Sequence, residues 1–234
     1  MNLADEIITS VKNFYYDLNQ DKNCRYRSWE YCYANFTNAR KNKNYDVDFL
    51  CLHLAFYLAS WGMYRGSSFL LQKDYRVHIP IIEEIFKTKY DVLCGIECQQ
   101  LKDMKIQELL FEQLVKNIKI YYNKVRDSVK KQKIKMQISD TLITKILMGT
   151  MGCVPAYDRY FISGIKKTNV ATGIFNKESI EKLIDFYENN KEQFETQRKT
   201  MKIENLSYPQ MKLLDMGFWQ LGYNIETKNK HELY

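Results

Sequence analysis

Apolar side chains recur along most of the chain at spacings of three and four residues, the period of an amphipathic helix. The first such stripe predicts a helix over residues 3–18, and a strongly apolar run predicts a more central helix over 46–61. The longest stripe runs from about residue 102 to 131. At 1.5 Å per residue it would form a helix roughly 45 Å long. This periodicity predicts an all-α fold.

Capping residues and prolines place the ends of the expected helices. Ser28, Asp46, Ser139 and Asn176 stand where a side chain can accept a hydrogen bond from a first-turn N–H. Proline is tolerated in a first helical turn, so each of the three prolines marks a further start. These signals add expected helices over 28–40, 80–93, 139–148, 155–165 and 176–201, and from 209 onward. The chain should therefore contain about eight or nine helices.

The composition agrees with a helical globular protein. Nine glycines and three prolines in 234 residues are too few for the many turns of an all-β fold. A hydrophobic content of 45 % and a mean hydropathy of −0.47 exclude wholesale disorder and a membrane-embedded body. We expect one all-α domain over 1–234, or two closely packed subdomains over 1–100 and 101–234. The expected core includes Leu54, Leu58, Leu110, Leu114, Ile146 and Leu183.

Targeting and redox signals predict a cytoplasmic protein without a membrane segment. The first ten residues are charged early and lack the apolar region of a signal peptide. The longest uncharged stretch, 49–64, is shorter than the ~20 residues that span a bilayer. The six cysteines form no CxxC pair, and with three histidines they give no zinc-finger spacing. Reduced thiols are expected, with no metal and no cofactor.

The positive charge is concentrated in one segment. Residues 116–135 hold eight Lys or Arg and one acidic residue, which accounts for the whole formal charge of +7. Such a segment suits a phosphate backbone, whereas the alternative is an ordinary solvated helix face. The candidate nucleic-acid-binding residues of the segment are Lys116, Lys119, Lys124, Arg126, Lys130, Lys131 and Lys133.

Residues 143–161 combine a helix, a glycine-bearing turn, a proline and a Tyr-Asp-Arg sequence. This stretch resembles the helix-hairpin-helix superfamily of DNA glycosylases, in which a lysine-bearing helix and a tight turn lead into a catalytic aspartate. The resemblance implies a catalytic role for Asp158 and places Lys145 as the helix-borne lysine. It covers about 20 residues, and GTMG stands here in place of the family's GxG hairpin. Alternatively, Asp158 is an acidic residue that stabilises a helix start.

A second motif, Trp61 to Ser68, places two glycines and Arg65 directly after the apolar helix. Its backbone N–H groups and Arg65 could hold a phosphate, or Gly62 or Gly66 could simply end the helix. Arg159 is a further candidate for phosphate contact. For a flipped nucleotide the candidate pocket residues are Trp61, Tyr64, Tyr157 and Trp219.

Together these features favour a nucleic-acid-binding protein with DNA or RNA as its partner. The resemblance implies a base-excising hydrolase in which Asp158 stabilises a positively charged sugar. The alternative is a non-enzymatic helical protein whose basic helix binds an acidic protein partner.

Overall fold

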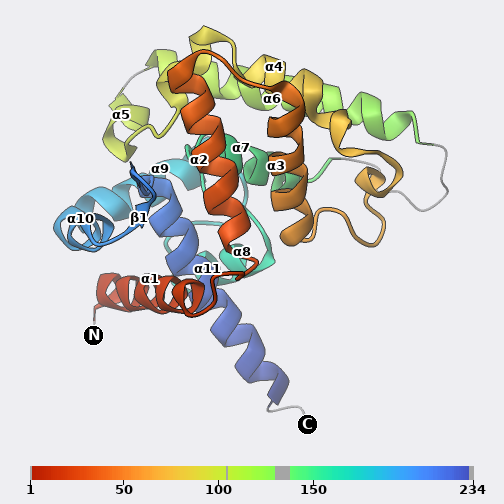
Figure 1. The fold of residues 1–234 in the computed structure, drawn as a ribbon. Helices are drawn as coiled ribbons and strands as arrows, with labels where there is room; N and C mark the ends of the chain where they lie inside the picture. The colour runs from red at the N-terminus through yellow and green to blue at the C-terminus, as the bar shows by residue number, and fades with distance from the viewer. Residues whose placement is uncertain (1, 104, 130–137, 232–234) are drawn as a thin grey trace. The chain divides into compact units, whose positions relative to one another are not determined.

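The computed structural model describes residues 2–103, 105–129 and 138–231, which fold into two compact units (Figure 1). Unit 1 comprises 2–24, 95–103 and 152–231, and unit 2 comprises 25–94, 105–129 and 138–151. The chain passes from one unit to the other more than once. A single division near residue 100 therefore does not describe these units.

Unit 1 is built around the C-terminal helix. Its elements are α1 (Leu3–Gln20), α5 (Cys98–Asp103), α8 (Arg159–Lys167), α9 (Lys177–Asn189), α10 (Lys191–Lys199), the two-stranded antiparallel β1 (Lys202–Ile203) and β2 (Leu206–Ser207), and α11 (Gln210–His231). Every residue from 210 to 222 is buried. Helices α1, α8, α9 and α10 all pack against α11, and Figure 1 shows α1 crossing it.

Two glycines allow α8 and α11 to cross with their backbones in contact. A Cβ atom on Gly164 of α8 would lie 2.1 Å from the carbonyl oxygen of Phe218. One on Gly222 of α11 would lie 1.9 Å from the carbonyl oxygen of Tyr160. Neither position has room for any side chain. The crossing holds α8 against the centre of unit 1.

Unit 2 surrounds the apolar helix expected over 46–61. Its elements are α2 (Arg27–Asn42), α3 (Val47–Ser60), the 3₁₀ helices η1 (Phe69–Gln72), η2 (Tyr75–His78) and η3 (Thr88–Leu93), and the helices α4 (Ile79–Ile85), α6 (Lys105–Asp127) and α7 (Asp140–Thr150). Helix α3 packs against α2, α4 and α7. The indole N–H of Trp29 donates to the carbonyl of Met148 at 3.0 Å, which ties α2 to α7.

The all-α prediction is confirmed, although the described residues form more than eight or nine helices. The capping side chains of Asp46, Ser139 and Asn176 accept first-turn N–H groups as expected. The Ser28 cap is wrong, because Ser28 lies buried inside α2. The helix expected from Pro155 begins only at Arg159, after an extended Asp158.

One long helix of the prediction is interrupted, because the 176–201 helix is divided at Asn190 into α9 and α10. The stripe over 102–131 includes the end of α5, which belongs to unit 1, and the whole of α6, which belongs to unit 2. The short hairpin of β1 and β2 carries no strong alternation and was not predicted. The expected core is confirmed at Leu54, Leu58, Leu114, Ile146 and Leu183, each fully buried, but Leu110 is only half-buried.

The helices of the described residues include none with both the length and the apolar character required to span a bilayer.

Candidate functional site

Unit 2 gathers aromatic rings and cations where α2 begins and α3 ends. Tyr26, just before α2, stacks on Trp61, just after α3, with ring centroids 5.1 Å apart. The Arg25 guanidinium lies 5.0 Å from the centre of the Tyr26 ring. The Lys145 amine of α7 lies 4.9 Å from the centre of a Trp61 ring. We call Arg25, Tyr26, Trp61, Arg65 and Lys145 the aromatic–cation cluster.

The two arginines of this cluster are open to solvent. Arg65 lies over Gly62, whose Cβ atom would be only 2.9 Å from the arginine Nε. Arg25 and Arg65 are both exposed, and neither forms an ion pair within the described residues. Lys145 differs, because it is only 1 % exposed. The cluster therefore has two accessible cations, Arg25 over the Tyr26 ring and Arg65 over Gly62, and a buried third cation, Lys145, over a Trp61 ring.

The backbone after α3 shows that Gly62 ends the helix. Gly62 has a φ of +79° and its N–H donates to the carbonyl of Ala59 at 2.9 Å. The N–H of Met63 donates to Leu58 at 2.8 Å. This pair of bonds is the Schellman motif. Gly62 thus has the capping role that the sequence offered as an alternative, and the side chain of Arg65 packs over it.

Tyr64 anchors the same loop to α6 through a buried histidine. Its hydroxyl lies 2.8 Å from Nε2 of His78, and Nδ1 of His78 lies 2.6 Å from the hydroxyl of Tyr122. His78 is fully buried, and burial lowers its pKa to about 3. A neutral imidazole has one N–H donor and one acceptor nitrogen, so it can donate to one tyrosine hydroxyl and accept from the other. This chain fixes the loop that carries Arg65.

We expect the buried His78 to make unit 2 sensitive to acid. The unfolded chain binds a proton at this histidine near pH 6.5, whereas the folded chain does so only near pH 3. The unfolded state therefore holds more protons between these values. His78 should reduce the free energy of unfolding by about 1.4 kcal/mol for each unit that the pH falls within this window.

Urea unfolding at pH 7, 5.5 and 4.5 measures this effect. Because other groups also titrate, wild type is compared with His78→Gln. The free energy of unfolding of this variant should depend less steeply on pH. A matched His53→Gln variant changes a half-buried histidine that contacts Asn35. Equal slopes in wild type and His78→Gln would contradict the assignment.

The structure divides the candidate cations of α6 into two kinds. Lys119 forms an ion pair with Asp140 at 3.1 Å, and Arg126 forms one with Asp127 at 2.6 Å. Lys116 and Lys124 are exposed and form no ion pair within the described part of the chain. Lys130, Lys131 and Lys133 lie outside the described residues. Of the predicted cations on α6, Lys116 and Lys124 therefore remain available to a partner.

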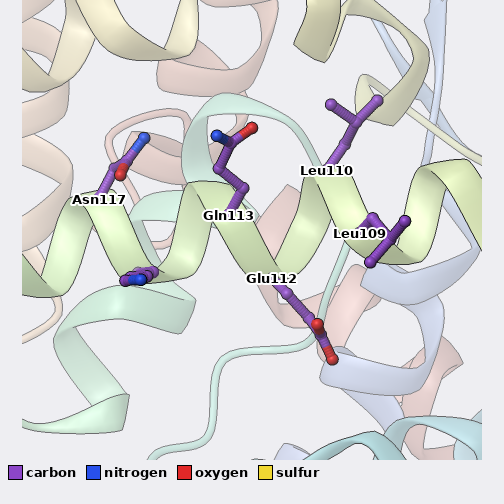
Figure 2. A pocket seen from close by; sticks show the side chains of 6 residues that line it. Leu109, Leu110, Glu112, Gln113 and Asn117 are labelled. Atoms are coloured by element: carbon purple, nitrogen blue, oxygen red, sulfur yellow. The ribbon is translucent and has the colours of Figure 1, made fainter.

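A hollow of about 580 Å³ lies beside Lys116. Its lining residues all come from α6: Leu109, Leu110, Glu112, Gln113, Lys116 and Asn117. Figure 2 shows Leu110, Gln113 and Asn117 on one side of the helix and Glu112 on another. Asn117 also donates to Glu84 at 2.7 Å. The lining thus combines one cation with a carboxylate and apolar groups, so it is not a basic pocket.

Asp158 lies in unit 1 as the N-cap of α8. Its carboxylate accepts hydrogen bonds from the N–H groups of Tyr160 at 3.1 Å and Phe161 at 3.2 Å. The residue is half-buried. The carboxylate thus satisfies two N–H groups of the first turn of α8. Asp158 therefore has the capping role of the structural alternative, in a position that still leaves part of it open.

The segment before Asp158 is held by α11. Asp215, only 4 % exposed, accepts a hydrogen bond from the N–H of Ala156 at 2.9 Å and forms an ion pair with Lys212. The carbonyl of Ala156 accepts in turn from the N–H of Asp158 at 2.8 Å. The place of Asp158 in unit 1 thus depends on the buried carboxylate of Asp215, 57 residues later in the chain.

Other predicted residues of unit 1 have structural partners. Arg159 forms an ion pair with Glu226 at 2.9 Å. Tyr157 is buried, with its hydroxyl 2.9 Å from that of Ser179, and burial raises its pKa to about 12. Trp219 is buried and stacks on Tyr223. Tyr157 and Trp219 belong to unit 1, whereas Trp61 and Tyr64 belong to unit 2.

Sequence reasoning missed Arg25, Tyr26, His78 and Asp215. Arg25 and Tyr26 lie just before the helix expected over 28–40, and nothing in their spacing relates them to Trp61. His78 bridges two tyrosines, and Asp215 holds the segment before Asp158. Both arrangements join residues that are distant in sequence. Such contacts leave no local signal.

The described residues contain no group of three or more His, Cys, Asp or Glu side chains placed to hold a metal ion. The six cysteines are free thiols. No family model, curated protein or solved structure matches the chain.

Proposed function

We propose that the protein binds nucleic acid and that the aromatic–cation cluster of unit 2 contacts the bound strand. The observation that carries this proposal is the stacked pair of Tyr26 and Trp61 with the exposed Arg25 over the Tyr26 ring, together with the exposed Arg65 over Gly62. Neither arginine forms an ion pair within the described residues. Lys116 and Lys124 of α6 supply further exposed cations in the same unit.

This combination fits a sugar-phosphate chain with unpaired bases better than it fits an acidic protein. Arginine binds phosphate oxygens through two parallel N–H groups, and it stacks on flat rings. Bases stack on aromatic side chains regardless of their sequence. Arg25 is the exposed end of the stack, so it can move from the Tyr26 ring to a phosphate and leave that ring face to a base. An acidic peptide would use the arginines but would gain nothing from the rings.

We expect binding to weaken with salt and to depend on both arginines. If about five phosphates are neutralised, the logarithm of the association constant should fall with that of the salt concentration with a slope near −3.5 for a single strand. The Arg25→Ala, Arg65→Ala double variant should bind roughly tenfold or more weakly and give a shallower slope. Fluorescence anisotropy of a labelled single-stranded oligonucleotide measures both quantities.

The matched control changes two exposed lysines of unit 1, Lys166→Ala and Lys167→Ala, which alter the net charge equally. Tyr26→Leu separates stacking from charge, because it should weaken binding while leaving the salt slope unchanged. Equal affinity of the arginine variant and the lysine control would reject the cluster as the binding site. Binding of a poly-glutamate peptide with the same affinity would favour the acidic-protein alternative.

Base excision by Asp158 is the second proposal. What supports it is that the N-cap geometry fixes a half-buried carboxylate at a helix start. A charged carboxylate stabilises the cationic sugar that develops as a glycosidic bond breaks, or orients the attacking water. Lys145 has no nucleophilic part in this proposal, because its amine is buried beneath the Trp61 ring. Asp158 would thus act with water alone.

A further inference from the structure

Helix α3 exposes an apolar stripe although it lies at the centre of its unit. Phe49 and Leu52 are each 47 % exposed and Phe56 is 65 % exposed. Ala59, one turn later, is exposed as well. These four residues, which we call the α3 seam, carry no charge. Apolar residues of this size that are exposed together on one helix face mark an interaction site.

The spacing of the seam is that of a helix-pairing surface. Phe49, Leu52, Phe56 and Ala59 follow one another at intervals of three, four and three residues. This is the a/d pattern by which two helices pack side by side at a shallow angle. The opposite face of α3, which includes Leu50, Leu54 and Leu58, is buried within unit 2. The exposed pattern is therefore additional to the one that builds the core.

We infer that the α3 seam binds the same seam of a second copy of this chain, with the two α3 helices antiparallel. A two-fold axis between Leu52 and Phe56 puts Phe49 opposite the partner's Ala59 and Leu52 opposite the partner's Phe56. Each pair joins a larger with a smaller side chain, so the seam is complementary to itself. A parallel pair would instead set Phe49 against Phe49 and Phe56 against Phe56.

The helix dipoles favour the same direction, and the uncharged seam adds no repulsion between two copies. The chain carries a formal charge of +7, so two copies repel each other wherever charged surfaces meet. The seam is free of that repulsion because its four residues are uncharged. In the antiparallel arrangement the N-terminal end of each α3 lies beside the C-terminal end of the other, and the helix dipoles attract.

The helix next to the seam extends the surface. Helices α2 and α3 run side by side (Figure 1), and Asn35 of α2 lies 3.3 Å from Nε2 of His53 on α3. Tyr31, one turn before Asn35 on α2, is 48 % exposed. The seam and Tyr31 together offer roughly 400–500 Å² per copy. Because stable dimers bury about 800 Å² per partner, this dimer should be weak and should form only as the concentration rises.

Sedimentation equilibrium of the full chain tests the inference. From about 1 μM to about 500 μM, the weight-average mass should rise from 28.0 kDa toward twice that value. Leu52→Glu and Phe56→Glu each set a carboxylate against an apolar side chain of the second copy and should raise the dissociation constant at least tenfold. The control is Leu109→Glu on α6, whose side chain is exposed by 64 %, almost as much as that of Phe56.

The direction of pairing has its own test. In a background of Cys24→Ser and Cys94→Ser, a mixture of Leu52→Cys and Phe56→Cys chains should form disulfide-linked dimers faster than either chain alone. A monomer at every concentration, or equal weakening by Leu109→Glu, would overturn the inference. Faster linking of Leu52→Cys to itself would overturn the antiparallel arrangement. Neither result depends on nucleic-acid binding.

Discussion

Gly222→Ala should destabilise unit 1 by about 3 kcal/mol or more, although alanine normally favours a helix over glycine by about 1 kcal/mol. The substitution destabilises here because the added Cβ atom would lie 1.9 Å from the carbonyl oxygen of Tyr160, a backbone atom that cannot rotate away. Helices α8 and α11 would have to separate, and the packing on both sides of the crossing would open. Gly164→Ala meets the carbonyl of Phe218 in the same way and should have a similar effect.

Thermal unfolding followed by circular dichroism measures this change. In a chain of this length, 3 kcal/mol corresponds to a fall of roughly 6–12 °C in the melting temperature. Gly217→Ala is the matched control on the same helix, because its nearest obstacle is a methyl group of Ile7 at 2.5 Å. A side-chain methyl can shift, so that variant should lose less. Equal melting temperatures for Gly222→Ala and Gly217→Ala would show that the crossing is not as tight as described.

Asp158→Asn should abolish base excision while leaving the fold intact. Asparagine still accepts hydrogen bonds from the N–H groups of Tyr160 and Phe161 and remains a good N-cap. Stability should therefore fall by at most about 1 kcal/mol. The lost negative charge, in contrast, removes the stabilisation of a cationic transition state. Groups of this kind contribute about 10²-fold or more to the rate.

The measurement is product formation on oligonucleotides that carry modified bases, together with the melting temperature of each variant. Asp46→Asn is the matched control, because Asp46 caps α3 through the same two kinds of backbone bond. Loss of turnover in Asp158→Asn but not in Asp46→Asn assigns the chemistry to Asp158. Equal turnover in wild type and Asp158→Asn would contradict a catalytic role, and no excision by wild type on any substrate would reject the activity itself.

Part of the candidate site could be predicted from the sequence. Trp61, Arg65 and Lys145 were singled out from a glycine-bearing turn and a lysine-bearing helix, and the structure brings these three into one cluster with Arg25 and Tyr26. The basic segment 116–135 was also evident, but its spacing gave no sign that Lys119 and Arg126 would be paired with acidic residues. Charge counts do not show which cations have partners, because those partners are set by the fold.

The sequence by itself determined the helical class, most of the buried stripes and several helix starts. These features depend on interactions within a turn or two, such as the bonds from the Asp46, Ser139 and Asn176 side chains to first-turn N–H groups. Only the tertiary structure decided the division into two interleaved units, the glycine crossing of α8 and α11, the burial of His78 and the bond from Asp215 to Ala156. Each of these joins residues far apart along the chain. Their energies come from shape and burial in three dimensions, which no local pattern records.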